Sequence, residues 1–242
     1  MNYKYGIQMY SVRDMATENL GAALRAVGNL GFKQVEFAGF FDHSADEICK
    51  MMEDAGVTVC STHSNWRDLM PEKIDETIAF HKAIGNKRFV IPNASLGTVE
   101  QLDNFISVVN VAKEKLAANG IDLGFHNHSV EFEVKYWGST IHSELEKRTD
   151  LTFTIDTYWA FNAGLDPIAL LERLGDRVKT IHLKDGFAGG RGVALGEGHA
   201  PVKSCLDYAR TKDLNIVVES EGLQPTGIQE VERCMEYLKA ND

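Results

Sequence analysis

The chain is poor in the residues that mark several specialised protein classes. It has four cysteines in 242 residues, and none are in a CxxC pair (Cys49, Cys60, Cys205, Cys234). This excludes a disulfide framework and a zinc knuckle, so we expect reduced, mostly buried thiols. No run of about 18 apolar residues occurs, which argues against a transmembrane helix. Residues 1–14 also lack the apolar stretch of a signal peptide, so a cytoplasmic protein with no membrane partner is the default expectation.

Basic residues are also in deficit. The chain has 25 Lys and Arg against 35 Asp and Glu, which gives a formal net charge of −10. A nucleic-acid partner requires a basic surface, so we expect none. There is no Pro/Ser-rich linker, low-complexity tract or shift in composition along the chain. The sequence therefore predicts one globular domain over residues 1–242.

What the sequence does contain is an alternation of two patterns. Eight short β-rich runs are each followed by a segment with helical spacing. The predicted strands are 6–12, 34–38, 58–63, 88–92, 122–128, 151–157, 178–184 and 215–221. The predicted helices begin near residues 18, 44, 72, 98, 139, 167, 201 and 227. Eight strand–helix units are typical of a single (β/α)8 TIM barrel, an α/β fold. A doubly wound sheet is the alternative, but no G-x-G-x-x-G follows the first run.

In a barrel of this kind, chemistry takes place at the carboxyl ends of the strands. Alternate strand residues face the interior, which predicts where the polar side chains of the last strands point. Asp156 ends the sixth strand, His182 and Lys184 lie in the seventh, and Glu219 and Glu221 lie near the end of the eighth. We expect these side chains to meet at one mouth of the barrel.

The fifth strand adds to this group. His126 and His128 have the inward parity, and Glu131 follows three residues later. Oxygen ligands with one imidazole and no thiolate suit Mn²⁺ or Mg²⁺ better than structural zinc. Three buried, unpaired carboxylates would be costly without a cation. We therefore predict one divalent ion, Mn²⁺ first, with Mg²⁺, Co²⁺ or Zn²⁺ as alternatives. The predicted ligands are Glu131, Asp156, His182 and Glu219.

Each predicted ligand also has a plainer interpretation. A single Asp at a strand end is often the N-cap of the next helix, which applies to Asp156. A single strand histidine such as His182 is often a hydrogen-bonded core residue, and Glu219 could pair with a lysine. The metal interpretation depends on all these residues lying at equivalent ends of neighbouring strands.

Further residues are predicted to contact a substrate, because they end strands with the inward parity or lie in loops at the mouth. They are Gln8, Tyr10, His63, His126, Trp159 and Glu221. The stretch 186–198 after the seventh strand is rich in glycine, which predicts a mobile flap over the site.

At these positions the sequence resembles the xylose isomerase-like barrel superfamily, and within it proteins of the sugar phosphate isomerase/epimerase type. The matching segments are GIQMYSV (6–12), FHNHSVEFE (125–133), TIDTYW (154–159), IHLKDG (181–186), LGEG (195–198) and VVESEG (217–222). The resemblance implies one Mn²⁺-type ion on Glu131, Asp156, His182 and Glu219, with the two glutamates also moving protons. Glu133 and Glu221 are alternatives to Glu131 and Glu219.

The HNH-x-x-E form at 126–131 resembles a subgroup that includes enzymes acting on 3-keto-glycosides, in which His128 would be a base. The predicted function is a metal-dependent isomerase or epimerase of a small sugar or sugar phosphate. It would transfer protons through a metal-stabilised enediolate. The predicted catalytic residues are Glu131, Glu219, His128 and Lys184. The alternatives are a lyase that eliminates from a 3-keto-glycoside or inosose, and a non-catalytic sugar-binding barrel. A homo-oligomer is compatible with each.

Overall fold

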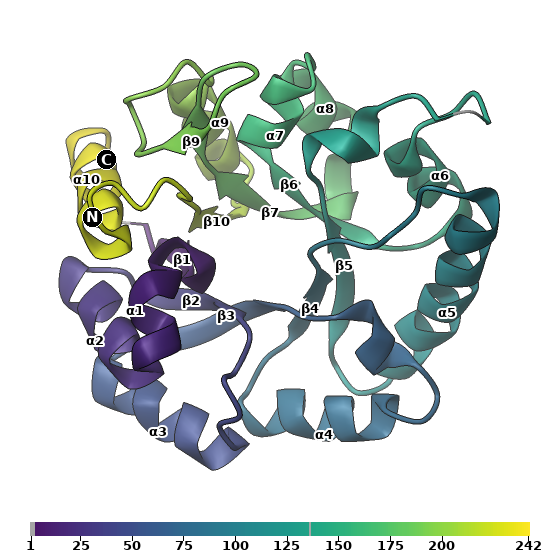
Figure 1. The fold of residues 1–242 in the computed structure, drawn as a ribbon, viewed down its shortest axis with the longest axis horizontal. Helices are drawn as coiled ribbons and strands as arrows, with labels where there is room; N and C mark the ends of the chain where they lie inside the picture. The colour runs from purple at the N-terminus through teal and green to yellow at the C-terminus, as the bar shows by residue number, and fades with distance from the viewer. Residues whose placement is uncertain (1–2, 136) are drawn as a thin grey trace.

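The computed structural model describes residues 3–135 and 137–242, and its centre is a closed barrel of eight parallel strands (Figure 1). The strands are β1 (Gly6–Gln8), β2 (Gln34–Ala38), β3 (Thr58–His63), β4 (Arg88–Ile91), β5 (Asp122–His126), β6 (Thr152–Asp156), β7 (Val178–Leu183) and β10 (Asn215–Val218). Each strand pairs with its neighbour in the chain, and β10 closes the barrel against β1. The predicted (β/α)8 fold class is confirmed.

Helices form a ring around the strands (Figure 1). The ring contains α2 (Leu20–Leu30), α3 (Ala45–Ala55), α4 (Ile74–Ala83), α5 (Val99–Ala117), α6 (Ile141–Arg148), α8 (Pro167–Leu174), α9 (Val202–Thr211) and α10 (Gly227–Ala240). Strand residues such as Val35, Phe37 and Ile181 are fully buried in one apolar core with helix residues such as Leu24. Among the described residues, no helix is long and apolar enough to cross a membrane.

Two elements at the mouth depart from the predicted pattern. The first strand ends at Gln8, because its side-chain oxygen accepts the Tyr10 N–H at 3.0 Å and starts a 3-10 turn over Met9–Val12. A short helix, α1 (Arg13–Glu18), follows this turn. Another short helix, α7 (Thr157–Asn162), directly follows β6. In both places a polar side chain caps a helical turn, so the strand ends earlier than its apolar pattern predicts.

The glycine-rich stretch after β7 is a hairpin of two short strands, β8 (Asp185–Gly186) and β9 (Gly192–Val193). The buried Asp185 carboxylate accepts backbone N–H groups from Gly196, Gly198 and Ala200 at 2.8–3.1 Å. A Cβ on Gly198 would lie 2.3 Å from Asp185 Oδ1. Close packing against this carboxylate accounts for the glycine at 198, and the mobile flap stays a prediction.

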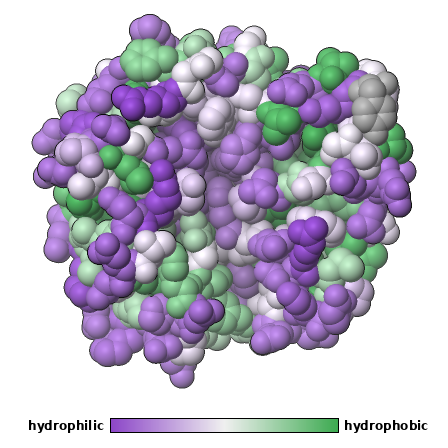
Figure 2. All heavy atoms as spheres, in the orientation of Figure 1, coloured by the Kyte–Doolittle hydropathy of each residue, from purple (hydrophilic) through white to green (hydrophobic). Residues whose placement is uncertain are grey.

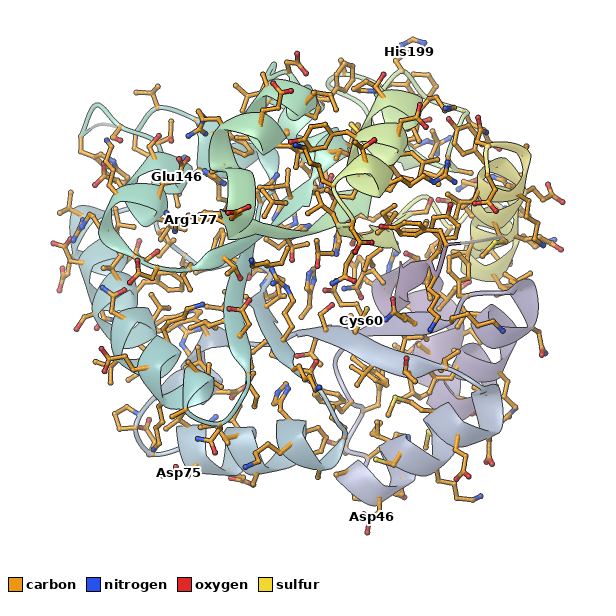
Figure 3. All side chains as sticks on the ribbon, turned by 180° about the vertical axis from the view of Figure 1, so that it is seen from behind. Asp46, Cys60, Asp75, Glu146, Arg177 and His199 are labelled. Atoms are coloured by element: carbon orange, nitrogen blue, oxygen red, sulfur yellow. The ribbon has the colours of Figure 1, made fainter. Side chains whose placement is uncertain are left out.

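The amino-terminal end of the barrel is held by structural contacts. Arg177 donates to the backbone carbonyls of Glu146, Thr149 and Leu151 at 2.7–3.0 Å, and Arg177 and Glu146 lie close together in the view from behind (Figure 3). His199 lies at the edge of the molecule in the same view. The Arg177 contacts stabilise the amino-terminal end of the barrel, whereas His199 belongs to the loop between β9 and α9, which follows the carboxyl end of β7.

Candidate active site

Five ionisable side chains gather inside the barrel at the carboxyl ends of its strands. They are Glu36 of β2, His126 of β5, Asp156 of β6, His182 of β7 and Glu219, which directly follows β10. None is more than 4% exposed. A hollow with hydrophilic residues opens near the centre of the face in Figure 2. Buried charge at this density is typical of a functional site and is costly in a core that serves only for packing.

Four of these side chains could hold a metal ion. One ligand atom from each of His126, Asp156, His182 and Glu219 lies within 4.8 Å of the others. His126 Nε2 is 3.6 Å from Asp156 Oδ2 and 3.8 Å from Glu219 Oε2. Asp156, His182 and Glu219 were predicted as ligands, whereas His126 was predicted to contact substrate. The fifth strand contributes His126 to this group, and not Glu131.

Buried polar atoms that lack a hydrogen-bond partner support the binding of a metal ion at this cluster. Within the described part of the chain, both ring nitrogens of His126 and Asp156 Oδ2 are buried without a hydrogen-bond partner. A buried polar atom left unpaired costs about 1–3 kcal/mol, so such atoms at one point call for a partner. Two imidazoles and two carboxylates, with no thiolate, form a donor set that divalent first-row ions accept.

Glu131 folds back on its own loop. Its Oε2 accepts the backbone N–H of His128 at 2.7 Å, and burial raises the pKa of Glu131 to about 7. The pair spans the first turn of the 3-10 helix Ser129–Phe132. The x-x-Glu spacing that suggested a ligand is also the spacing of a capping box. Glu131 therefore holds the loop that carries His128.

The two candidate ligands of this segment can be told apart by substitution. We expect Glu131→Gln to keep its bound Mn²⁺, because the amide oxygen can still accept the His128 N–H. We expect His126→Gln to bind the ion at least about tenfold more weakly. Elemental analysis after reloading with Mn²⁺ and gel filtration measures both. An ion lost from Glu131→Gln and retained by His126→Gln would restore Glu131 as the ligand.

His182 is clamped between two carboxylates. Its Nε2 lies 2.7 Å from Glu36 Oε1 and its Nδ1 lies 2.9 Å from Glu219 Oε2. Burial opposes the charged ring, but Glu36 and Glu219 raise the pKa of His182 to about 10. Metal-binding histidines usually donate their other ring N–H to such a carboxylate. Glu36 is therefore placed to orient His182 toward the ion through Nδ1.

Glu36 was missed in the sequence, and it changes the role of Gln8. Gln8 donates to Glu36 Oε1 at 2.6 Å and Ser61 donates to Oε2 at 2.5 Å. His63 Nε2 also lies 3.1 Å from Oε1. Gln8 is fully buried, so it supports Glu36 and does not line the cavity that a substrate would enter. The sequence signal that could have identified Glu36 is its place between the apolar Val35 and Phe37 in a predicted strand, which gives it the inward parity.

The role of Glu36 can be measured directly. We expect Glu36→Gln to lower Mn²⁺ affinity about 10- to 100-fold, because an amide accepts the His182 N–H without compensating its charge. Asp122→Asn is the matched control, since Asp122 pairs with Arg88 and Lys113 at the start of β5. Titration of Mn²⁺ by calorimetry should leave the control unchanged. Equal affinities in Glu36→Gln and wild type would show that Glu36 is structural only.

Lys184 supplies a second cation inside the site. It is fully buried, with Nζ 2.8 Å from Glu221 Oε2 and 3.8 Å from both Asp156 Oδ2 and Glu219 Oε2. Burial lowers the pKa of Lys184, but Glu219, Asp156 and Glu221 raise it above the ordinary value. Together with His182, the chain therefore partly balances its own carboxylates, and buried acids alone do not require a metal ion. The orphaned atoms are the stronger evidence for one.

A cavity of about 350 Å³ opens beside this cluster. It is lined by Tyr10, Ala38, His63, Pro92, Asn93, His126, His128, Glu219 and Glu221. The residues predicted at the mouth that do line it are Tyr10, His63, His126, His128, Glu219 and Glu221. Trp159 packs behind the cavity, with its ring 5.7 Å from the His128 ring and 4.8 Å from Lys184 Nζ. Asn93 was missed because a neutral amide after β4 carries no charge pattern.

Of the cavity histidines, His128 lies outside the four-residue ligand group, and within the described residues its ring forms no ion pair with a carboxylate. Burial lowers the pKa of His128; Glu219 and Glu221 oppose this, and Lys184 and His182 add to it, so the pKa stays below its usual value. A lowered pKa favours the neutral ring, which can accept a proton. Glu221 faces the same cavity from the chain after β10 and is held by Lys184. Proton-accepting groups thus reach the cavity from two different strands.

The comparison with protein families agrees with this architecture. The family model described as xylose isomerase-like TIM barrel matches residues 24–240. The chain belongs to this family. A search of the curated proteins finds no match.

Solved structures show the same fold with different activities. A sugar phosphate isomerase/epimerase from Parabacteroides distasonis superposes with a TM-score of 0.84 at 24% identity, over 98% of this chain and 97% of that chain. The probable 3-DHS dehydratase from Bacillus anthracis gives 0.75 at 13% identity, over 99% and 100%. An L-ribulose 3-epimerase gives 0.74 at 15%, over 98% and 94%. At these identities the likeness shows the fold, so any activity must be argued from the site.

Proposed function

We propose that this protein is a metal-dependent isomerase or epimerase that acts on a small sugar. The observation that carries the proposal is the cluster of His126, Asp156, His182 and Glu219 beside a cavity that His128 also lines. Membership of the xylose isomerase-like family supports it. Mn²⁺ suits the mixed imidazole and carboxylate ligands.

The proposed ion would be held by His126, Asp156, His182 and Glu219. When bound, a divalent ion supplies a Lewis acid that makes the proton next to a sugar carbonyl easier to remove. The neutral ring of His128 would take that proton, and an enediolate would result. Return of the proton to the same carbon from the other face gives an epimer, and return to the neighbouring carbon gives an isomer.

The other polar groups have supporting parts in this proposal. Glu221 also lines the cavity and is the candidate for a second acid–base group: its acid form would deliver a proton to the enediolate, while His128 keeps the proton it removed and later returns it to solvent. Lys184 does not line the cavity, so its proposed part is to hold Glu219 and Glu221 in place through its ion pairs with them. Lys184 was predicted as a catalytic residue, and we propose instead that it is a positioning residue.

Solvent exchange tests the proposal. Protein reloaded with Mn²⁺ would be incubated in D₂O with a panel of ketoses and ketose phosphates and followed by NMR. We expect deuterium to enter one of them next to the carbonyl, and the exchange to stop when EDTA removes the ion. No exchange in any sugar, with the ion shown to be bound, would favour the sugar-binding barrel. Release of an aglycone or water from a 3-keto-glycoside or inosose, with an enone absorbance, would establish the lyase.

A further inference from the structure

A second cavity adjoins the catalytic one, and we propose that it binds an uncharged glycosyl unit attached to the reacting sugar. This subsite has a volume of about 280 Å³. It is lined by His63, Ser64, Asn65, Trp66, Arg67, Pro92, Asn93, Ala94 and Ser95. The inference rests on the proposed function, because it names the class of substrate that would enter the same site.

The two cavities meet at the ends of β3 and β4. His63, Pro92 and Asn93 line both of them, so a bound molecule passing these residues would leave one cavity and enter the other. The first cavity, about 350 Å³, lies at the low end of ligand sites, which run from about 300 to 1,000 Å³, and the second, about 280 Å³, lies just below it. A single sugar ring reacting beside His126 would leave the second cavity to water.

The lining of the subsite suits hydroxyl groups. Asn93 and Ser95 are exposed polar residues of this lining, so their side chains can meet a ligand. Asn65 uses its oxygen to accept the Arg67 N–H at 3.0 Å, which leaves its NH₂ group available. Amides and hydroxyls both donate and accept, as sugar hydroxyls do. Trp66, held edge-on against Phe105 at 5.5 Å, adds an apolar wall for the ring carbons.

The charges argue against a phosphate in this place. Arg67 is the single Lys or Arg among the residues that line the two cavities. Its guanidinium lies 5.3 Å from the centre of the Trp66 ring. The adjoining cavity adds Glu219 and Glu221 to the lining and no further Lys or Arg. Phosphate sites usually combine several charge-assisted donors, and a neutral ring needs none.

The test compares D-fructose with three glucosyl fructoses, namely turanose, maltulose and isomaltulose. Binding to the Mn²⁺-loaded protein is measured by calorimetry, and deuterium exchange is measured in the same samples. We expect at least one glucosyl fructose to bind about tenfold or more tightly than fructose. Ser95→Trp should fill the subsite and remove this gain without changing the affinity for fructose. Ser95→Ala is the matched control for the loss of the hydroxyl, and circular dichroism checks that both variants fold.

The outcomes separate the subsite from the proposed function. Equal binding of fructose and all three glucosyl fructoses would overturn the subsite. Tighter binding of fructose 1-phosphate or 6-phosphate, lost in Arg67→Gln, would replace it with an anion site. A glucosyl gain that Ser95→Trp removes, without deuterium exchange in any sugar, would uphold the subsite and count against the proposed reaction.

Discussion

Replacing Asp156 with asparagine is expected to abolish metal binding and activity while leaving the fold in place. The two oxygens of Asp156 do different things. Oδ1 accepts the Trp159 N–H at 2.8 Å and caps α7, whereas Oδ2 is buried without a hydrogen-bond partner at the ligand cluster. Asparagine keeps one oxygen for the cap and replaces the other with an NH₂ group that cannot bind a cation. Burial raises the pKa of Asp156 to about 7, so a neutral side chain is tolerated here.

The measurement is elemental analysis of tag-free protein reloaded with Mn²⁺, together with the exchange assay. We expect about one ion per chain in wild type and almost none in Asp156→Asn. Turnover should fall by roughly 10³-fold or more, which corresponds to about 4 kcal/mol of lost stabilisation of the transition state.

The alanine variant separates the two oxygens. With metal removed by EDTA, Asp156→Asn should unfold within about 3 °C of wild type, while Asp156→Ala also loses the cap, worth about 1 kcal/mol. An asparagine variant that retains the ion would show that Asp156 is a helix cap alone.

The fold was predictable because it depends on repeated local patterns. Period-two runs such as 34–38 and 151–157 mark strands, and eight of them in order define the barrel. The early ends of the first and sixth strands were not predictable from apolar pattern, because they depend on one side chain each. Gln8 and Asp156 bond to the backbone two and three residues ahead and start a helical turn there. Hydrophobic periodicity carries no signal for such a bond.

The site was predictable where a polar residue interrupts an apolar strand, as at Asp156, His182 and Glu219. It was not predictable where two chemically suitable residues compete. Glu131 and His126 are both reasonable ligands, and what separates them is that Glu131 bends back to bond its own loop. Glu36 was missed for a related reason. Its partner His182 is 146 residues away, and their strands are not neighbours but meet across the barrel interior.

Replacing His128 with glutamine is expected to slow deuterium exchange by about 10²- to 10⁴-fold without removing the ion, because loss of a positioned general base has this range of effect. Glutamine has a similar size and keeps a polar end, but it cannot take a proton near neutral pH. His128 lies outside the ligand cluster, so the metal content should stay near the wild-type value. A metal-loaded variant that exchanges slowly would assign the proton transfer to this ring.

The matched control for His128→Gln is His142→Gln. His142 is also a buried imidazole, but it pairs with Glu146 at 2.7 Å and does not line the cavity. Its loss should lower the unfolding temperature and leave the exchange rate per folded molecule unchanged. If His128→Gln exchanges as fast as wild type, the base must be another group on the cavity wall. Glu221 is then the next candidate, because it lines the same cavity and Lys184 Nζ holds its Oε2 at 2.8 Å.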